Sequence, residues 1–253
     1  MRVAVIGGTG VLGAAVVREL SARGHQVRVV SRTAPADQTV EHRAADLATG
    51  SGLESALDGC DTVVDAVSAR RRTRSVMVDG VRRLLEAEKQ AGVGHHVEIS
   101  IVGCDLVPFA YYRAKVDQEH VVTTGEIPWT LLRATQFHEL VNEILAMPAR
   151  WRIGLRSSAK VQPIDVTAVA TRLADAVDNG PAGRISDIAG PSVHTLTELV
   201  DIYRKHTGRK LFPLPVPIPG RAGRALRSGA LCVDGHGEAI GIGYAEWLSR
   251  LTR

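Results

Sequence analysis

The chain has 253 residues, 45% of them hydrophobic and 23% charged, a composition typical of a globular protein with one large core. No apolar run approaches the ~20 residues needed to cross a bilayer, and the strand pattern starts at the N-terminus and leaves no room for a signal peptide, so we expect a cytoplasmic protein without a membrane partner. The net charge is +4, but aromatic residues make up only 4% of the chain and do not alternate with its arginines, so we expect no nucleic-acid partner.

The first thirteen residues combine a buried strand with a glycine-rich turn. Residues 3–6 form a continuous apolar run, and glycines follow at positions 7, 8, 10 and 13 before a helix that begins near Val11. Glycine lets the backbone approach a phosphate closely, and the start of the helix directs free N–H groups and the positive end of its dipole at the turn. This context predicts a dinucleotide-binding turn, and the absence of a following Gly-Lys-Ser/Thr excludes a P-loop. The expected contacts are Gly7, Thr9, Gly10, Val11, Leu12 and Gly13.

Segments typical of strands and helices alternate along the rest of the chain, which predicts a doubly wound, Rossmann-type α/β fold with a parallel sheet. We expect strands at residues 26–31, 40–45, 61–67, 96–100, 129–133 and 184–189. We expect helices from Val11 to a C-cap at Gly24, over 75–91, over 110–123, along an apolar stripe at 166–177, and after a capping box at Thr195 and Glu198. Prolines alternate with apolar residues over 213–219, which indicates an extended segment that is not a central strand.

The end of the second expected strand indicates which dinucleotide binds. A carboxylate at this place holds the ribose 2′-hydroxyl of NAD, but here the sequence reads Ser31-Arg32-Thr33, and the first carboxylate is Asp37. An arginine can pair with a 2′-phosphate through two hydrogen bonds, and the two hydroxyls can donate to it. The sequence therefore favours NADP(H), with NAD(H) as the second possibility. Further expected cofactor contacts follow the next two strands, at Asp46, Leu47, Ala66 and Val67.

A tyrosine and a lysine lie four residues apart in the helix expected over 110–123. Residues four apart share a helix face, so Tyr111 and Lys115 are expected to point at one ligand, whereas Tyr112 lies on another face. An ammonium near a phenol favours the phenolate, and such a phenol exchanges a proton with a carbonyl or alcohol oxygen. Ser100 ends the fifth expected strand, at the sheet edge where ligands of such folds bind. These three residues are the expected catalytic group, with an ordinary surface pair as the alternative interpretation of the tyrosine and lysine.

On these motifs the chain resembles the atypical short-chain dehydrogenases/reductases of the NmrA-like, NAD(P)-binding type over nearly its whole length. The residues that carry the resemblance are Gly7, Gly10 and Gly13, the Ser-Ile-Val-Gly at 100–103, the Tyr-Tyr-Arg-Ala-Lys at 111–115 and the Leu-Arg-Ala-Thr-Gln-Phe at 132–137. The resemblance implies NADP(H) on the N-terminal half and the family's serine, tyrosine and lysine at Ser100, Tyr111 and Lys115. The serine-to-tyrosine spacing of eleven is slightly shorter than in typical members.

The resemblance also implies a small C-terminal lobe that closes a substrate cleft. We expect a single domain over 1–253, in which residues of roughly 136–163 and 185–253 form this lobe. The loop after the sixth expected strand is expected to lie beside the nicotinamide, with Thr135, Gln136, Phe137 and His138 as candidate substrate contacts.

These expectations combine into an NADPH-dependent oxidoreductase that transfers hydride to a small apolar carbonyl, enone or quinone. Two alternatives stay open. One is a non-catalytic NADP(H) sensor that regulates a partner, since the family includes such regulators. The other is a sugar-nucleotide epimerase or dehydratase, which uses the same tyrosine and lysine. The chain is expected to be a monomer or a homodimer.

The remaining polar residues point to no further site. Cys60, Cys104 and Cys232 are isolated, and His95 and His96 lack companion ligands, so no disulfide framework or metal site is expected. We expect the Arg-rich segments to be solvated faces or the rim of a site for an anionic ligand. These segments are Arg70-Arg71-Arg72-Thr73-Arg74 and the arginines at 221, 224 and 227. The sequence indicates no role for His236.

Overall fold

The computed structural model describes residues 1–37, 39–69, 73–235 and 237–251. Three arginines of the first Arg-rich segment, at 70–72, and His236 therefore lie outside the described residues. The chain forms two compact units. Unit 1 contains residues 1–100, 110–132 and 169–185, and unit 2 contains residues 101–109, 133–168 and 186–253.

Unit 1 is built on a sheet in the order β6-β5-β4-β1-β2-β3. Neighbouring strands from β5 to β3 are parallel, and Val5 at the centre pairs with Val29 on one side and Val64 on the other. The strands are β1 (Arg2–Ile6), β2 (Gln26–Ser31), β3 (Glu41–Ala44), β4 (Thr62–Asp65), β5 (His95–Ile101) and β6 (Trp129–Ala134). The doubly wound α/β fold is confirmed.

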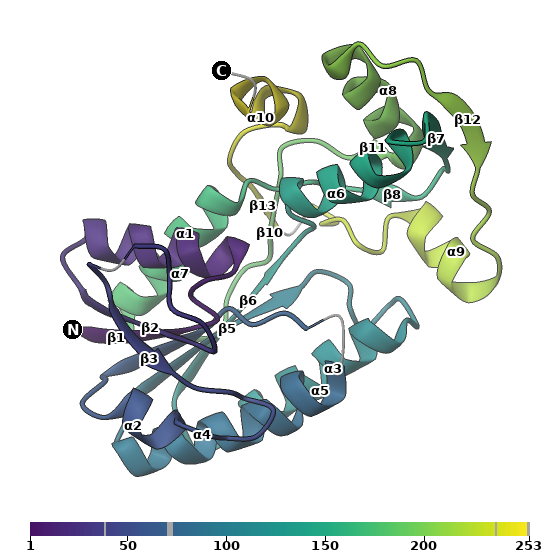
Figure 1. Cartoon of the computed structure of the whole chain (residues 1–253). Coiled ribbons are helices and arrows are strands. Elements are labelled where there is room, and N and C mark those ends of the chain that lie inside the picture. The colour runs from purple at the N-terminus through teal and green to yellow at the C-terminus, as the bar shows by residue number, and fades with distance from the viewer. Residues whose placement is uncertain (38, 70–72, 236, 252–253) are drawn as a thin grey trace. The chain divides into compact units, whose positions relative to one another are not determined.

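Helices cover both faces of this sheet (Figure 1). On one face lie α1 (Val11–Ala22) and α7 (Val166–Asn179), which are joined by ion pairs of 2.8 Å from Arg23 to Asp175 and Asp178. On the other lie α2 (Leu53–Leu57), α4 (Asp79–Ala91) and α5 (Ala110–Thr123). Such two-sided cover explains why residues 3–6 of β1 form a continuous apolar run and why all four residues of β4 are buried.

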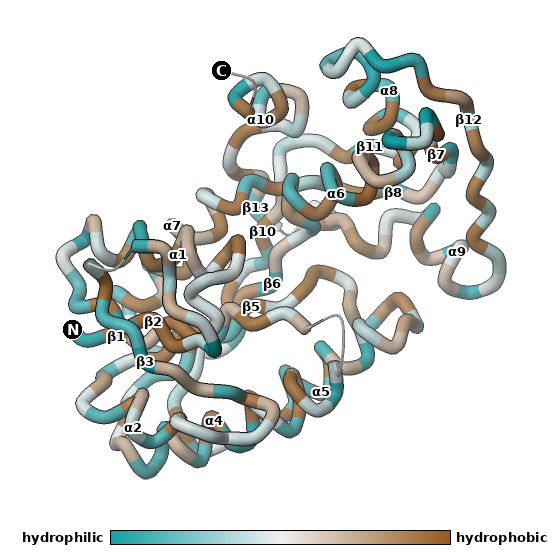
Figure 2. Tube along the Cα trace, viewed as in Figure 1, coloured by the Kyte–Doolittle hydropathy of each residue, from teal (hydrophilic) through white to brown (hydrophobic). Residues whose placement is uncertain are grey.

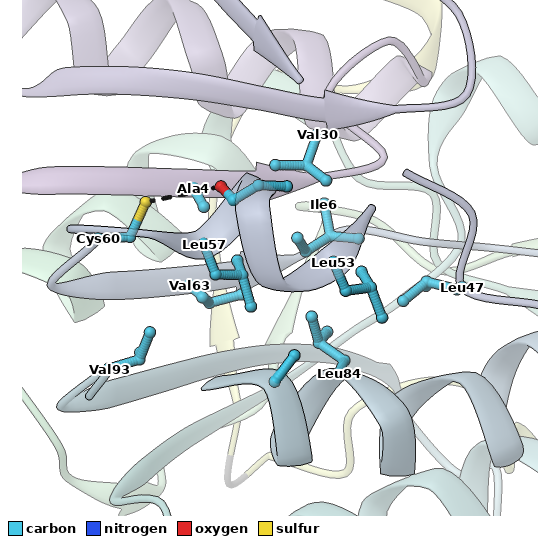
Figure 3. Packing of buried hydrophobic residues seen from close by; sticks show 12 residues of the cluster. Ala4, Ile6, Val30, Leu47, Leu53, Leu57, Cys60, Val63, Leu84 and Val93 are labelled. Atoms are coloured by element: carbon cyan, nitrogen blue, oxygen red, sulfur yellow. Dashed lines mark hydrogen bonds between the residues drawn. The ribbon is translucent and has the colours of Figure 1, made fainter. Parts of the chain in front are cut away.

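The core between the sheet and the helices α2 and α4 shows how the sequence specifies this packing (Figure 3). Ile6 from β1 and Val63 from β4 meet Leu53 and Leu57 of α2, and Leu84 of α4 closes the cluster from below. Each of these side chains is at most 3% exposed. Replacing one such leucine by alanine typically lowers the free energy of unfolding by about 2–5 kcal/mol, so this cluster contributes strongly to the stability of unit 1.

Two expected elements differ from the structure. The helix expected over 75–91 is divided at Val78 into α3 (Thr73–Met77) and α4, although backbone hydrogen bonds from Val78 to Arg74 and from Arg82 to Val78 continue across the division. The strand expected over 184–189 is divided into β9 (Gly183–Arg184) and β10 (Ile188–Ala189). Leu131 pairs with Arg184 and Ala134 with Ile188, so one extra residue lies between the two pairings and interrupts the ladder as a bulge does.

Among the residues that the structure describes, unit 2 contains short strands and four helices that lie wholly within it. Ile188 of β10 pairs with Ala134, and β10 also pairs with β13 (Glu238–Ala239). Two further strand pairs occur in this unit. β7 (Ile153–Arg156) is parallel to β12 (Phe212–Pro215), and β8 (Lys160–Val161) is antiparallel to β11 (His194–Thr195). The helices are α6 (His138–Ala149), α8 (Leu196–Thr207), α9 (Gly220–Ser228) and α10 (Tyr244–Leu251).

Two expectations about unit 2 are confirmed. The hydroxyl of Thr195 accepts from the N–H of Glu198, whose carboxylate accepts from the N–H of Thr195, so the capping box starts α8. The proline-rich segment is extended and contributes β12 to a two-stranded sheet rather than to the centre of a large one. Among the described residues, no helix combines the length and the apolar character needed to span a bilayer.

Candidate functional site

The turn between β1 and α1 is closed by direct backbone contacts. Gly7 has φ +73°, and its carbonyl accepts from the N–H of Gly10 at 2.9 Å. A Cβ added to Gly13 would overlap the carbonyl oxygen of Gly7, so only glycine lets α1 lie this close to the end of β1. The expected roles of these glycines as a tight turn and a close helix contact thus agree with the geometry.

The start of α1 fits a pyrophosphate group. Gly10 is the N-cap residue, no side chain accepts from the first turn of the helix, and no acidic residue occurs there. Thr9, Gly10 and Val11 are exposed, whereas Leu12 is buried below them. Free N–H groups and the positive end of the helix dipole therefore face a backbone cradle that a Cβ would fill, which is the arrangement that binds phosphate at a helix N-terminus.

The loop after β4 lies against this turn. A Cβ on Gly7 would be 3.0 Å from Cγ2 of Val67, and the N–H of Ala66 donates to the carbonyl of Ile6. The carboxylate of Asp65 accepts from the N–H of Val67 at 2.9 Å and so fixes the bend. Both Ala66 and Val67, expected beside the nucleotide, thus lie next to the glycine turn.

The end of β2 presents one cation at the sheet edge. Arg32 is exposed, whereas the hydroxyl of Ser31 donates to the carbonyl of Thr33 at 2.7 Å and lies 3.2 Å from Nε2 of His42. Asp37, the first carboxylate after β2, accepts from both the N–H and the hydroxyl of Thr39. The arginine is therefore the side chain of this segment best placed to receive a phosphate.

The residues expected after β3 form a local turn. The carboxylate of Asp46 accepts from the N–H of Ala48, and its N–H donates to the carbonyl of Ser51. Leu47 is 7% exposed, and its carbonyl accepts from Arg83. Asp46 thus stands at the surface with one oxygen committed to the turn, while Leu47 belongs to the core.

The expected tyrosine, lysine and serine all belong to unit 1. Tyr111 and Lys115 lie one turn apart on α5, and the phenol of Tyr111 is 2.9 Å from the hydroxyl of Ser68, in the loop after β4. The ammonium of Lys115 donates to the carbonyl of Ile99 at 2.7 Å and forms an ion pair with Glu98 at 3.2 Å. The hydroxyl of Ser100 is buried at the end of β5 without a hydrogen-bond partner among the described residues.

A buried network of charged groups connects the end of β4 with α5. Gln118, one turn after Lys115, donates to Glu98 at 3.0 Å and to Asp65 at 3.4 Å. On the other side of Glu98, Nε2 of His96 lies 3.6 Å from its carboxylate. The Nδ1 of the same ring pairs at 2.8 Å with Glu88 of α4.

The network shifts the pKa of three of its members. Burial, reinforced by the charge of Glu98, raises the pKa of Asp65 to about 7. Burial works against the charged form of His96, but Glu88 and Glu98 outweigh it and hold its pKa well above the usual value. Burial likewise opposes the charge on Lys115, and the attraction of Glu98 still raises its pKa. Lys115 and His96 are therefore cations at neutral pH.

The sequence contains a signal for this network in β5. His96, Glu98 and Ser100 occupy alternate positions of β5, between the apolar Val97, Ile99 and Ile101, and alternate residues of a strand point to one face. Polar residues at such positions need partners, which here come from α4 and α5. Ser68 carries no comparable signal, because its partner Tyr111 lies 43 residues away in the sequence.

The four expected substrate residues lie in unit 2 and are mostly buried. Thr135 donates to the carbonyl of Gln162, and the amide of Gln136 donates to the carbonyl of Leu231 at 3.3 Å. Phe137 is half-buried and occupies the N-cap position of α6. His138 is fully buried, and its Nε2 lies 2.9 Å from the carbonyl of Ile242.

The ring of His138 packs 5.7 Å from that of Tyr244 and 5.5 Å from that of Trp247. Burial lowers its pKa, so the ring is a neutral part of the core of unit 2. Its place in the structure is thus a packing position, and a role in contacting substrate stays a prediction.

The first prediction concerns the glycine turn. We expect Gly13→Ala to weaken NADPH binding at least roughly tenfold, a loss of ~1.4 kcal/mol or more, because the new Cβ must displace the carbonyl of Gly7. Gly94→Ala is the matched control, because a Cβ there meets only an ordinary contact at 3.8 Å. Fluorescence titration with NADPH measures both. Equal affinity for the Gly13→Ala variant and the native protein would remove the cradle from the account.

The second prediction concerns pH. The pKa of Asp65 is about 7 in the folded state, against about 4 for an unfolded aspartate, so the folded state binds the extra proton between these values. Stability therefore falls as pH rises from about 4 to about 7, at up to ~1.4 kcal/mol per pH unit from this group. We expect Asp65→Asn to flatten the dependence in urea denaturation, while the exposed Asp58→Asn leaves it unchanged. An unchanged slope in the Asp65 variant would contradict the prediction.

Comparison with known proteins identifies the family of the chain. The NAD(P)H-binding family model matches residues 7–179, more than half of the chain. Quinone oxidoreductase 2 of Escherichia coli is 27% identical over 223 residues, which cover 83% of this chain and 76% of that protein. The photosystem II assembly factor Ycf39 of Synechocystis is 26% identical over 234 residues, 86% of this chain and 71% of its own. Three mycobacterial relatives are 33% identical over 99 residues, and the chain spans only 12% of their length.

Solved structures share the fold. The Escherichia coli NADPH-dependent quinone oxidoreductase in complex with NADPH has a TM-score of 0.82 at 21% identity, over 99% of this chain and all of that one. The triphenylmethane reductase of Citrobacter with NADP(H) has a TM-score of 0.78 at 20% identity, over 99% of both chains. At these identities the likeness shows the Rossmann-type fold. The family match, which begins at Gly7, shows more: the chain belongs to the NAD(P)H-binding family.

Proposed function

We propose that the protein is an NADPH-dependent oxidoreductase that reduces a small apolar carbonyl, enone or quinone. One observation carries the proposal: a continuous line of contacts joins the glycine turn to Tyr111. Gly7 lies against Val67, Val67 is bonded to Ser68, and the hydroxyl of Ser68 is 2.9 Å from the phenol of Tyr111. A nucleotide on the turn and a proton donor on α5 would thus be held by one short segment of chain.

The coenzyme, when bound, supplies the hydride. Tyr111 then donates its phenolic proton to the substrate oxygen, and Ser100 donates a hydrogen bond to the same oxygen from the end of β5. Support for Ser100 comes from its buried hydroxyl, which has no partner among the described residues. A buried hydroxyl without a partner costs free energy, and a bound ligand would satisfy it.

Lys115 carries a positive charge about one turn from Tyr111 on α5. Its ammonium has two protein partners, Glu98 and the carbonyl of Ile99, and an ammonium has three N–H groups. The remaining donor is proposed to bind the ribose of the nucleotide. Its raised pKa keeps the positive charge through neutral pH, and that charge favours the phenolate left when Tyr111 gives up its proton.

Arg32 is the proposed determinant of preference for NADPH over NADH. It is exposed directly after β2, and the first carboxylate along the chain is turned toward Thr39. A guanidinium there provides a bidentate partner for a 2′-phosphate, with Thr33 beside it. Asp46 is proposed to accept from the adenine amino group, and Ala66 and Val67 to flank the ribose.

The names of two similar proteins support the proposed substrate class. The relative from Escherichia coli bears the name quinone oxidoreductase, and the neighbouring structure from Citrobacter is a triphenylmethane reductase. Both names describe enzymes that act on molecules built from unsaturated rings. Thr135, Gln136 and Phe137 remain the proposed substrate contacts.

The second candidate is a nucleotide-binding protein that acts on a partner without turnover. The relatives named photosystem II assembly factors favour it, since their names state no reaction. The same nucleotide turn serves both functions, so binding of NADPH does not separate them. Turnover does. An epimerase or dehydratase is supported by fold alone, through structures that are 17–19% identical.

The third prediction tests the proton donor. We expect Tyr111→Phe to lower turnover of NADPH with quinones or aldehydes by ~10²–10⁴-fold, because the substrate oxygen loses its acid, while NADPH binding is retained. Tyr112→Phe is the matched control, since its ring lies on another face of α5, 5.8 Å from that of Tyr111. Absorbance of the reduced nicotinamide measures turnover. Binding without turnover on a broad substrate panel would favour the second candidate.

The fourth prediction tests coenzyme choice. Arg32→Ala is expected to weaken NADPH binding by roughly 10–100-fold, the worth of hydrogen bonds to a charged group at about 1.5–3 kcal/mol, and to leave NADH binding nearly unchanged. Arg18→Ala, an exposed cation on α1, serves as the control. Calorimetric titration with both coenzymes gives the ratio. Equal weakening for NADPH and NADH would show that Arg32 does not bind the 2′-phosphate.

A further inference from the structure

We propose that unit 2 carries a surface that binds the face of an anionic phospholipid bilayer without crossing it. The surface comprises two segments, residues 144–164 and 202–233, and we call it the basic surface. It includes the arginines at 221, 224 and 227 and revises the expectation of no membrane contact. The proposal does not depend on the proposed function.

Charge is distributed very unequally along the chain. The two segments contain eleven of its 31 lysines and arginines and neither an aspartate nor a glutamate. In the rest of the chain, the other 20 basic residues are outnumbered by 27 acidic ones. The net charge of +4 therefore conceals a strongly positive surface on an otherwise acidic protein, and such asymmetry directs one face to an anionic partner.

The two segments lie side by side in the structure. β7 and β12 pair in register, with Phe212 opposite Ile153, and the N–H of Phe212 donates to the carbonyl of Arg152 at 2.7 Å. The guanidinium of Arg152 lies 5.5 Å from the centre of the Phe212 ring. The two segments that carry these eleven basic residues are thus joined through a single strand pair.

Two groups of cations flank β12 along the chain, one at the end of α8 and one in α9; Figure 1 shows β12 between these two helices. At the end of α8, Arg204, Lys205, Arg209 and Lys210 line a hollow together with Gly208 and Leu211. Lys205, Arg209 and Lys210 have no carboxylate partner among the described residues, whereas Arg204 and Arg156 share Asp201. After β12, the three arginines of α9 recur every third residue on its exposed side, opposite the buried Leu226.

Large apolar side chains are exposed between these cations. On and after α6, Met147 is 64% and Trp151 80% exposed, and on β12 Phe212 is 67% and Leu214 47% exposed. Figure 2 shows the chain pass from hydrophilic colour after α8 to hydrophobic colour in β12. Exposed aromatic and aliphatic groups surrounded by lysine and arginine are typical of proteins that insert side chains at the lipid headgroup level.

The same features disfavour other occupants. A second copy of the chain would bring two strongly positive surfaces together, which like-charge repulsion opposes. Pro213 and Pro215 lack N–H donors, so β12 offers a poor edge for an added strand. A nucleic acid would stack on the aromatic rings, but it would leave Met147 and Leu214 without a partner. An anionic bilayer accommodates both the cations and the aliphatic groups.

Sedimentation of the full chain with vesicles tests the proposal. One set contains phosphatidylcholine with roughly 30% phosphatidylglycerol, and the other phosphatidylcholine alone. We expect binding to the anionic set, weak binding to the neutral set, and loss of binding at about 1 M NaCl. Arg209→Gln/Lys210→Gln is expected to bind roughly 30-fold more weakly, from about 1 kcal/mol for each cation near the surface.

Two further variants separate the apolar contribution from charge. Trp151→Ser changes an exposed side chain and is expected to weaken binding to the anionic vesicles without altering NADPH affinity. Arg18→Gln/Arg82→Gln removes two exposed cations of unit 1 and is expected to bind like the native protein. Retained NADPH affinity in all variants keeps a failure here distinct from a failure of the nucleotide site.

Several results would overturn the proposal. No sedimentation with the anionic vesicles at low salt would do so, as would equal binding to neutral and anionic vesicles. Equal losses in the unit 1 control would show that charge acts without regard to position. Binding to a single-stranded oligonucleotide in the absence of vesicle binding would assign the basic surface to nucleic acid. A dimer that Arg209→Gln/Lys210→Gln strengthens, again without vesicle binding, would assign it to a second copy.

Discussion

The approach of α1 to the end of β1 is the constraint on which the rest of the structure depends. Gly13 can lie against the carbonyl of Gly7 because neither residue carries a side chain there, and Gly7 adopts a φ of +73° that other residues rarely tolerate. This contact aims the free N–H groups of α1 at the turn. The missing side chain of Gly7 also leaves space for Val67, and the next residue, Ser68, contacts Tyr111. The positions of the nucleotide cradle and of the proposed proton donor therefore both depend on Gly7.

The buried network beneath this site is costly, and its arrangement explains how the cost is limited. Asp65, Glu88 and Glu98 are completely buried carboxyl groups. Lys115 and His96 bring two positive charges, and the raised pKa of Asp65 lets that carboxyl carry a proton rather than a third negative charge. Isolated buried charges cost several kcal/mol each, so such groups are kept where partners satisfy them. Here they fix α5 on β5 and thereby the place of Tyr111.

Local signals in the sequence predicted most of unit 1 and part of unit 2. The apolar run of β1, the glycines of the turn and the capping box of Thr195 and Glu198 each act within a few residues, and the structure contains all of them. The family match confirms the NAD(P)H-binding interpretation. The contacts of Tyr111 with Ser68 and of Lys115 with Glu98 join segments 43 and 17 residues apart, and no local pattern specifies such pairs. Likewise, the burial of His138 depends on Tyr244 and Trp247, more than 100 residues later. The catalytic and substrate residues themselves stay predictions.

The most direct test of the central claim measures backbone amide hydrogen exchange with and without NADPH. A pyrophosphate held by main-chain N–H groups must slow exchange at residues 11–13, where the start of α1 is free of side-chain caps. We expect protection at these amides that rises with NADPH concentration and saturates. Saturating NADPH that leaves their exchange rates unchanged would contradict it.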